Sequence, residues 1–178
     1  AVLREEVADF KKLLHIDRLT GGASRITFEL AISTSHGQRR LALRLNPSDG
    51  NTDGFMTQRI TPIAEAKVMT IARSAGVPAP KITYILEEKD DLGEGFLMEW
   101  MTGESVGGRI TKNPEFNTIR PNLAAQCGNF LSKIHSINLS SSGLLEDLVI
   151  MDAKDFVVKQ FEIYKALSID RPMIDYVA

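Results

Sequence analysis

The stretch Leu41-Ala42-Leu43-Arg44-Leu45 alternates leucine with a small residue and then a cation, and it constrains the fold more than any other part of the chain. Successive side chains of a β-strand point to opposite faces. The three leucines are therefore expected to face a core, while Ala42 and Arg44 share the other face. A small side chain beside a cation leaves room for a phosphate group. The strand thus predicts one buried face and one candidate binding face.

The composition is that of an ordinary globular protein. The 178 residues are 43% hydrophobic and 25% charged, enough for one good core or two small ones. Lysine and arginine number 21 against 23 aspartates and glutamates, and no dense basic run favours nucleic acid or an anionic membrane as a partner. No apolar stretch is long enough to span a bilayer, and the acidic start is unlike a signal sequence, so we expect a cytoplasmic protein. The single cysteine, Cys127, falls on the apolar stripe of a predicted helix and is expected to be buried.

The first half of the chain is rich in predicted strands. Apolar spacing predicts an amphipathic helix over residues 3–14, and alternation predicts three antiparallel strands between residues 16 and 45. Thr61-Pro62 is typical of a helix start, so a helix is expected from there to Gly76. Two further strands are expected over residues 81–87 and 95–101, and the second has so few polar residues that both its faces should be buried. The polar, glycine-rich segment 46–57 is expected to be a mobile loop.

The second half is expected to be helical, which makes the chain an α+β protein. Composition changes at residues 103–108, which we interpret as a linker without a helix because Pro114 follows. Apolar spacing predicts a long helix over residues 123–134 and another over 156–167, with a loop at 140–143 between them. The sequence therefore divides into residues 1–101, a hinge at 102–118 and a helical part at 119–178.

A glycine-rich segment and an arginine–glutamate pair could form a phosphate site. Gly21-Gly22-Ala23-Ser24 lies between two expected strands, where uncovered backbone N–H groups and the Ser24 hydroxyl can approach phosphate oxygens. Two glycines in a hairpin can equally be simple turn residues, so this segment alone leaves both interpretations open. Glu65 borders the buried stripe of its helix and can point toward the sheet, where Arg44 is the obvious ionic partner. We expect Arg44 and Glu65 to face each other where the helix meets the sheet.

The expected strand at 95–101 runs into the glycine hinge, where backbone groups could recognise a flat purine edge. A plain core strand would explain its apolar residues but not the glycines that follow. Two other motifs are rejected. Residues 103–108 have the glycine spacing of a P-loop, but Arg109-Ile110 stands where lysine and then serine or threonine are required. His15-Ile16-Asp17 has the spacing of a catalytic loop, but it precedes the glycines and lacks the metal-binding asparagine.

In their order along roughly residues 16 to 138, these segments resemble the aminoglycoside phosphotransferase family of small-molecule kinases. The segments that carry the resemblance are Leu19-Thr20-Gly21-Gly22-Ala23-Ser24, Leu41-Ala42-Leu43-Arg44, Glu65, Ala75-Gly76-Val77-Pro78-Ala79-Pro80, Phe96-Leu97-Met98-Glu99-Trp100 and Leu131-Ser132-Lys133-Ile134-His135. Protein kinases share the order of glycine loop, cationic strand and helix glutamate, with lysine where Arg44 stands. The strand ending at Arg44 and the stretch Gly76-Val77-Pro78-Ala79-Pro80 look closest to the branch related to acyl-CoA-dehydrogenase-associated kinases.

The resemblance implies a protein-kinase-like fold, in which an antiparallel sheet of about five strands and one main helix precede the first helices of a helical lobe. It also implies ATP between the lobes, with Mg²⁺ bridging its phosphates. The residues implied at the ATP site are Gly21, Gly22 and Ser24 over the phosphates, Ala42 and Arg44 on the strand, Glu65 orienting Arg44, Met98 as gatekeeper, and the Glu99 carbonyl and Met101 amide at adenine.

The family's His-Gly-Asp catalytic loop and its later metal-binding aspartate have no counterpart in these 178 residues. We therefore expect the full-length protein to transfer the γ-phosphoryl group of ATP to a hydroxyl of a small molecule, with the Mg²⁺ ligands outside this chain. This chain alone is expected to be inactive and able to self-associate through uncovered apolar stripes. Two alternatives stay open, namely a noncatalytic nucleotide-binding or pseudokinase module and an unrelated α+β interaction domain.

Overall fold

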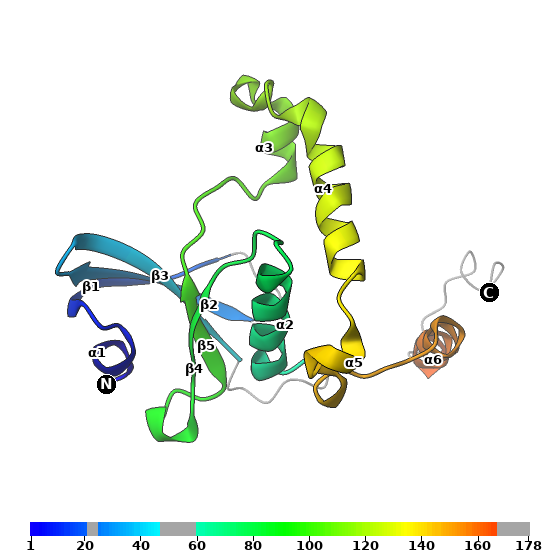
Figure 1. Ribbon diagram of the computed structural model, residues 1–178, viewed down its shortest axis with the longest axis horizontal. Coiled ribbons are helices and arrows are strands. Elements are labelled where there is room, and N and C mark those ends of the chain that lie inside the picture. The colour runs from blue at the N-terminus through cyan, green and yellow to red at the C-terminus, as the bar shows by residue number, and fades with distance from the viewer. Residues whose placement is uncertain (21–24, 47–59, 167–178) are drawn as a thin grey trace.

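Five strands form one antiparallel sheet in the first half of the chain, as the sequence predicts (Figure 1). The computed structural model describes residues 1–20, 25–46 and 60–166. The strands are β1 Phe10–Arg18, β2 Ile26–Thr34, β3 Gly37–Leu45, β4 Ile82–Ile85 and β5 Gly95–Glu99. Their order across the sheet is β1-β2-β3-β5-β4, so β3 and β5 lie side by side although α2 and β4 separate them in sequence.

The N-terminal helix is much shorter than its apolar spacing predicts. Helix α1 spans Val2–Glu6, and β1 begins at Phe10, which pairs with Thr34 of β2. Leu14, expected on the helix, lies in β1 with 42% of its surface exposed. Pairing with β2 supplies backbone hydrogen bonds along the strand, and this long-range gain overrides the helical spacing of four apolar residues. The prediction of a helix beyond Glu6 is therefore wrong, although Val7 directly after it is buried as expected.

Each face of the sheet carries its own core cluster. Leu41 belongs to the cluster on one face, and its neighbour Ala42 belongs to the cluster on the other. The first cluster is Val7, Leu30, Ile32, Leu41 and Leu97, and the second is Ala42, Ala66, Phe96 and Met98. The alternation predicted for β3 is therefore confirmed. Strand β5 contributes to both clusters, which is why it is buried on both faces as expected.

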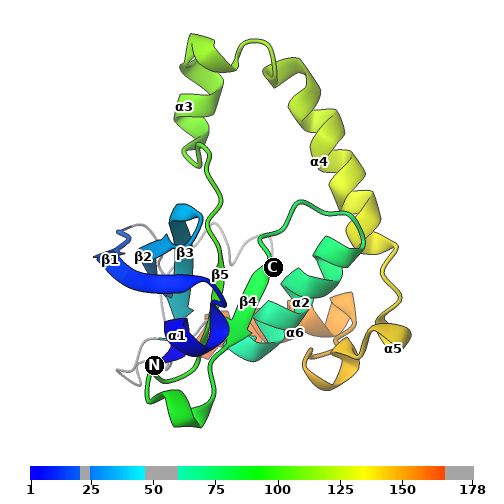
Figure 2. The same cartoon turned by 60° about the vertical axis from the view of Figure 1, so that its left-hand side comes forward.

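Helix α2 spans Pro62–Ser74 and begins where the sequence predicts. The Thr61 side chain accepts a hydrogen bond from the Ala64 N–H at 3.1 Å, and Pro62 takes the first helical position, where a missing N–H costs nothing. The chain leaves this helix through Gly76, whose φ of +82° is a left-handed conformation that glycine adopts without strain. Figure 2 shows α2 lying beside β4 of the sheet, so its N-terminal half is held close to β3 and β5.

Helices dominate the second half of the chain. They are α3 Gly107–Lys112, α4 Arg120–His135, α5 Leu139–Ser142 and α6 Ala153–Ala166, with short 3-10 turns at η1 Glu88–Asp90, η2 Pro114–Phe116 and η3 Leu144–Glu146. Figures 1 and 2 show the chain leaving the sheet and entering α3 away from it. Helix α4 then runs back, so that its C-terminal end lies near α2. No helix in the described ranges is both long and apolar enough to cross a membrane.

Three expectations for this half are wrong. Helix α3 forms although Pro114 argues against one in the sequence, because Asn113 ends the helix and lets Pro114 start a separate turn. Helix α5 occupies the segment predicted as a loop, since the Asn138 side chain accepts a hydrogen bond from the Ser141 N–H and caps it. Cys127 is exposed, because none of the residues of α4 is buried against the rest of the described chain.

Candidate functional site

Arg44 and Glu65 meet where β3 faces α2. The Arg44 Nη2 atom lies 3.2 Å from the Glu65 Oε1 atom, and their side chains are 33% and 18% exposed. Arg44 is on the face of β3 that it shares with Ala42, and Glu65 is in the first turn of α2. The prediction that these two residues face each other is confirmed.

Small residues beneath α2 bring this pair together. Ala42 of β3 and Ala66 of α2 belong to the same buried cluster and are 4% and 0% exposed. Because neither side chain extends beyond Cβ, the helix can approach the sheet closely. Glu65 precedes Ala66 directly, so this close approach brings its carboxylate to the face of the sheet beside Arg44, near the end of β3. Ala42 and Met98, both predicted near the nucleotide, are direct cross-strand partners inside this cluster.

A second arginine, Arg25, reaches the same carboxylate. Its Nε atom lies 3.6 Å from the Glu65 Oε2 atom, and its Nη2 atom donates a hydrogen bond to the Ile60 carbonyl. The Arg25 side chain is only 9% exposed. Arg25 is not among the predicted site residues, although the alternation of β2, extended back by one residue, indicates it. Thr27 pairs with Arg44, and Arg25 lies two residues before Thr27. Because side chains two residues apart in an extended chain point to the same face, both arginines are expected on one face of the sheet.

The charges of this cluster do not balance. Among the described residues, two guanidinium groups share one carboxylate, which leaves one net positive charge in a partly buried place. The Arg44 Nε atom is buried and has no hydrogen-bond partner among the described residues. A buried donor without an acceptor is costly, and a buried cation needs an anion. The arrangement therefore fits an anionic group such as a phosphate.

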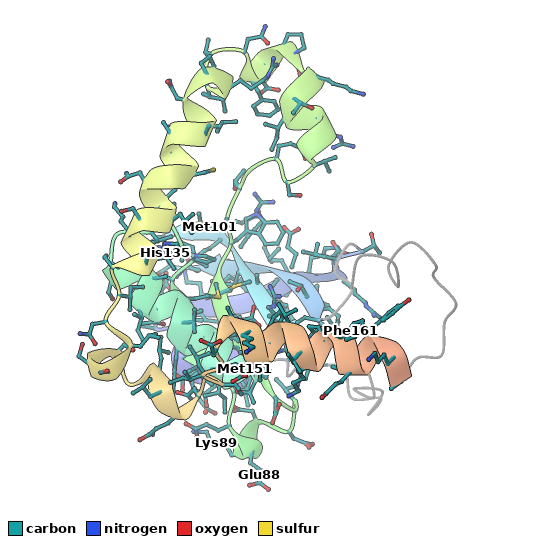
Figure 3. All side chains as sticks on the ribbon, turned by 90° about the vertical axis from the view of Figure 1, so that its right-hand side faces the viewer. Glu88, Lys89, Met101, His135, Met151 and Phe161 are labelled. Atoms are coloured by element: carbon teal, nitrogen blue, oxygen red, sulfur yellow. The ribbon has the colours of Figure 1, made fainter. Side chains whose placement is uncertain are left out.

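The end of β5 offers the remaining predicted site residues. The Glu99 N–H donates to the Lys81 carbonyl at 2.8 Å, and the Glu99 carboxylate accepts from the Lys81 N–H at 3.1 Å. Arg73 of α2 lies 3.5 Å from the same carboxylate, so the Glu99 side chain joins β5 to the start of β4 and to α2. Met101 lies where the chain leaves the sheet for α3, and it is 51% exposed (Figure 3).

Some of the predicted residues are not described by the structure, and the rejected His15-Ile16-Asp17 motif lies on β1. Gly21, Gly22 and Ser24 lie outside the described residues, as do residues 47–57 of the segment 46–57 that is predicted to be a mobile loop. His15 and Asp17 form an exposed pair on β1, with 2.7 Å between Nε2 and Oδ2. The described part of the chain contains no group of three or more His, Cys, Asp and Glu residues arranged to hold a metal ion.

A five-stranded antiparallel sheet and a capped helix, with an arginine–glutamate pair between them, form the arrangement that a kinase-like fold implies. The chain belongs to the phosphotransferase enzyme family, whose model matches residues 15–162. No curated protein matches this chain in sequence.

The fold is similar to a crystal structure of a proposed aminoglycoside phosphotransferase from Ralstonia eutropha, with a TM-score of 0.67 and 17% identity. The superposition covers 95% of this chain and 46% of that one, so the chain spans less than half the length of this neighbour. The predicted α+β, kinase-like fold is therefore confirmed.

Proposed function

We propose that this chain is the nucleotide-binding part of a phosphotransferase that moves the γ-phosphoryl group of ATP to a hydroxyl of a small molecule. The observation that carries the proposal is the contact of 3.2 Å between Arg44 and Glu65, beside a buried Arg44 Nε atom that lacks a described partner. The family match makes phosphoryl transfer the reaction class. An unrelated α+β interaction domain is inconsistent with that match.

The chain's own contribution is binding and positioning. Phosphoryl transfer depends on holding the phosphates in place and on neutralising their charge. In the proposal, Arg44 contacts the phosphates and Glu65 fixes the direction of its guanidinium group. Gly21, Gly22 and Ser24 would cover the phosphates, with Ala42 beside the nucleotide. Met98 would border adenine, which the Glu99 carbonyl and the Met101 amide would bind.

Mg²⁺ is expected from the family's chemistry, but the described residues hold no cluster that fits it. We assign its ligands, and the aspartate that orients the acceptor hydroxyl, to residues outside this chain. We accordingly expect this chain alone to bind ATP weakly and to turn over none. The family branch, the cytoplasmic location and the division at residues 101 and 118 remain predictions from the sequence.

Ligand-detected NMR titration of this chain with ATP and with adenosine tests the proposal, because it reports weak affinities. Arg44→Met should weaken ATP binding about tenfold or more and leave adenosine binding unchanged, since a hydrogen-bonded ion contact is lost. Arg39→Met is the matched control, because Arg39 is exposed on the opposite face of β3. No ATP binding by the unmodified chain, or equal loss in both variants, would refute the proposal. ADP release by the full-length protein would then separate an active kinase from a pseudokinase.

A further inference from the structure

We propose that Arg25 is a second phosphate-binding cation of this site, held beside Arg44 by the two oxygens of the Glu65 carboxylate. The inference rests on the proposed function, because the anion that the two guanidinium groups would share is the phosphate chain of ATP. It adds a residue that the arginine–glutamate pair alone does not include.

The geometry gives each arginine its own carboxylate oxygen. Glu65 Oε1 lies 3.2 Å from Arg44 Nη2, and Glu65 Oε2 lies 3.6 Å from Arg25 Nε. A carboxylate that contacts two guanidinium groups through different oxygens fixes the orientation of both groups, because the planar guanidinium group matches the planar carboxylate. The Glu65 carboxylate therefore fixes the positions of the Arg25 and Arg44 guanidinium groups relative to each other.

The strand register places both arginines on the same face of the sheet. Thr27 pairs directly with Arg44, and Arg25 lies two residues before Thr27, directly ahead of β2, where the alternation of the strand continues on the side of Thr27. Arg25 is also the first described residue after the segment Gly21-Gly22-Ala23-Ser24. A ligand held against Arg44 on this face would therefore lie within reach of Arg25.

Arg25 also keeps donors available. Its Nε atom faces Glu65 and its Nη2 atom donates to the Ile60 carbonyl, while its Nη1 atom makes no hydrogen bond or ion pair with a described residue. A guanidinium group has five N–H donors, so these two contacts leave several without a described acceptor. With the side chain 9% exposed, water alone satisfies them poorly. Phosphate oxygens would supply the missing acceptors and the missing negative charge.

A structural role, in which Arg25 only anchors the Ile60 carbonyl, predicts a different outcome and can be separated by experiment. The chain would be titrated with ATP, tripolyphosphate and adenosine by ligand-detected NMR, using Arg25→Met, Arg25→Lys and the control Arg39→Met. If Arg25 binds phosphate, Arg25→Met should weaken ATP and tripolyphosphate about tenfold or more, with adenosine unchanged. Arg25→Lys should restore only part of the loss, because one ammonium cannot serve Glu65 and a phosphate in the way a planar fork does.

The outcomes are distinguishable. If the unmodified chain and Arg25→Met bind ATP and tripolyphosphate equally, this inference is wrong and the proposed function stands. If the unmodified chain binds adenosine but neither phosphate compound, both are wrong. Circular dichroism without ligand shows whether Arg25→Met folds. If that variant does not fold, Arg25→Lys decides, and unchanged affinity of Arg25→Lys for ATP and tripolyphosphate would overturn the inference.

Discussion

Lys133 of α4 donates a hydrogen bond from Nζ to the carbonyl oxygen of Gly76 at 2.9 Å. This contact joins the C-terminal part of α4 to the turn that follows α2, the helix that carries Glu65. A second ion contact, 2.7 Å between Lys67 Nζ and Asp147 Oδ2, joins the exposed side of α2 to the segment after η3. Helix α2 and the turn that follows it therefore contact both the sheet and later segments of the chain.

Gly76→Ala should destabilise the chain. Gly76 has a φ of +82°, and a side chain there costs about 1–2 kcal/mol. The added Cβ would also lie 3.1 Å from Lys133 Nζ, the far end of a flexible side chain that can shift. Gly128→Ala is the matched control, since that site is inside α4 with nothing within 4 Å, and alanine there should stabilise the helix by up to about 1 kcal/mol. Urea unfolding of both variants measures the difference, and equal shifts would contradict this prediction.

Glu65→Gln should lower both stability and ATP affinity. The substitution leaves two guanidinium groups, Arg25 and Arg44, without their shared carboxylate. Because the Arg44 side chain is one-third exposed, water offsets part of the loss, and we expect about 1–2 kcal/mol in the free energy of unfolding. Glu88→Gln, on the exposed turn η1, is the control (Figure 3). A Glu65→Gln variant as stable as the Glu88→Gln variant would show that the cluster contributes nothing to folding.

Ala66→Leu should push α2 away from the sheet. Ala66 is fully buried against Ala42, and added methylene groups in a packed core cost about 1–3 kcal/mol. The separation of Arg44 from Glu65 should increase, so ATP binding should weaken beyond the loss of stability. Thr70→Leu, one turn later on an exposed position, is the control for added size. Thermal unfolding and ATP titration of the two variants decide, and unchanged ATP affinity in a folded Ala66→Leu variant would argue against tight coupling of packing and binding.

The Glu104 carboxyl should titrate below the usual range of glutamate. Its pKa is lowered because the Val106 N–H donates to it at 2.8 Å and because Arg109 lies 3.4 Å away, although partial burial opposes this. A group with a depressed pKa in the folded state stabilises the chain above its unfolded pKa, and that contribution disappears as pH falls through the folded value. NMR of the Glu104 side-chain carboxyl against pH measures the midpoint. Arg109→Ala should move the midpoint partly back toward the usual value, and a midpoint at or above that value in the unmodified chain would contradict the prediction.

The alternation in β3 and the capped start of α2 are local patterns, and both could be predicted from the sequence. Strand alternation and a threonine–proline helix start depend on a few adjacent residues, so no distant contact is needed to read them. The contact between Arg44 and Glu65 could be predicted from the same two patterns. Arg44 borders a buried face of the sheet, Glu65 borders the buried face of α2, and these two faces pack together. The shared cluster around Glu65 was predicted only in part, since Arg25 was not included.

What only the tertiary structure decided depends on contacts between distant segments. Phe10 and Leu14 continue the helical apolar spacing of residues 3–14, yet pairing with β2 places them in a strand, because a sheet partner supplies hydrogen bonds that local spacing cannot reveal. Cys127 has the spacing of a buried residue, yet it is exposed, because the described chain buries no residue of α4. The position of Arg25 beside Glu65 arises because the register of β2 and β3 and the packing of α2 bring three separate segments to one point. The sequence alone thus determined which local elements form, and long-range packing decided which charged groups share a site.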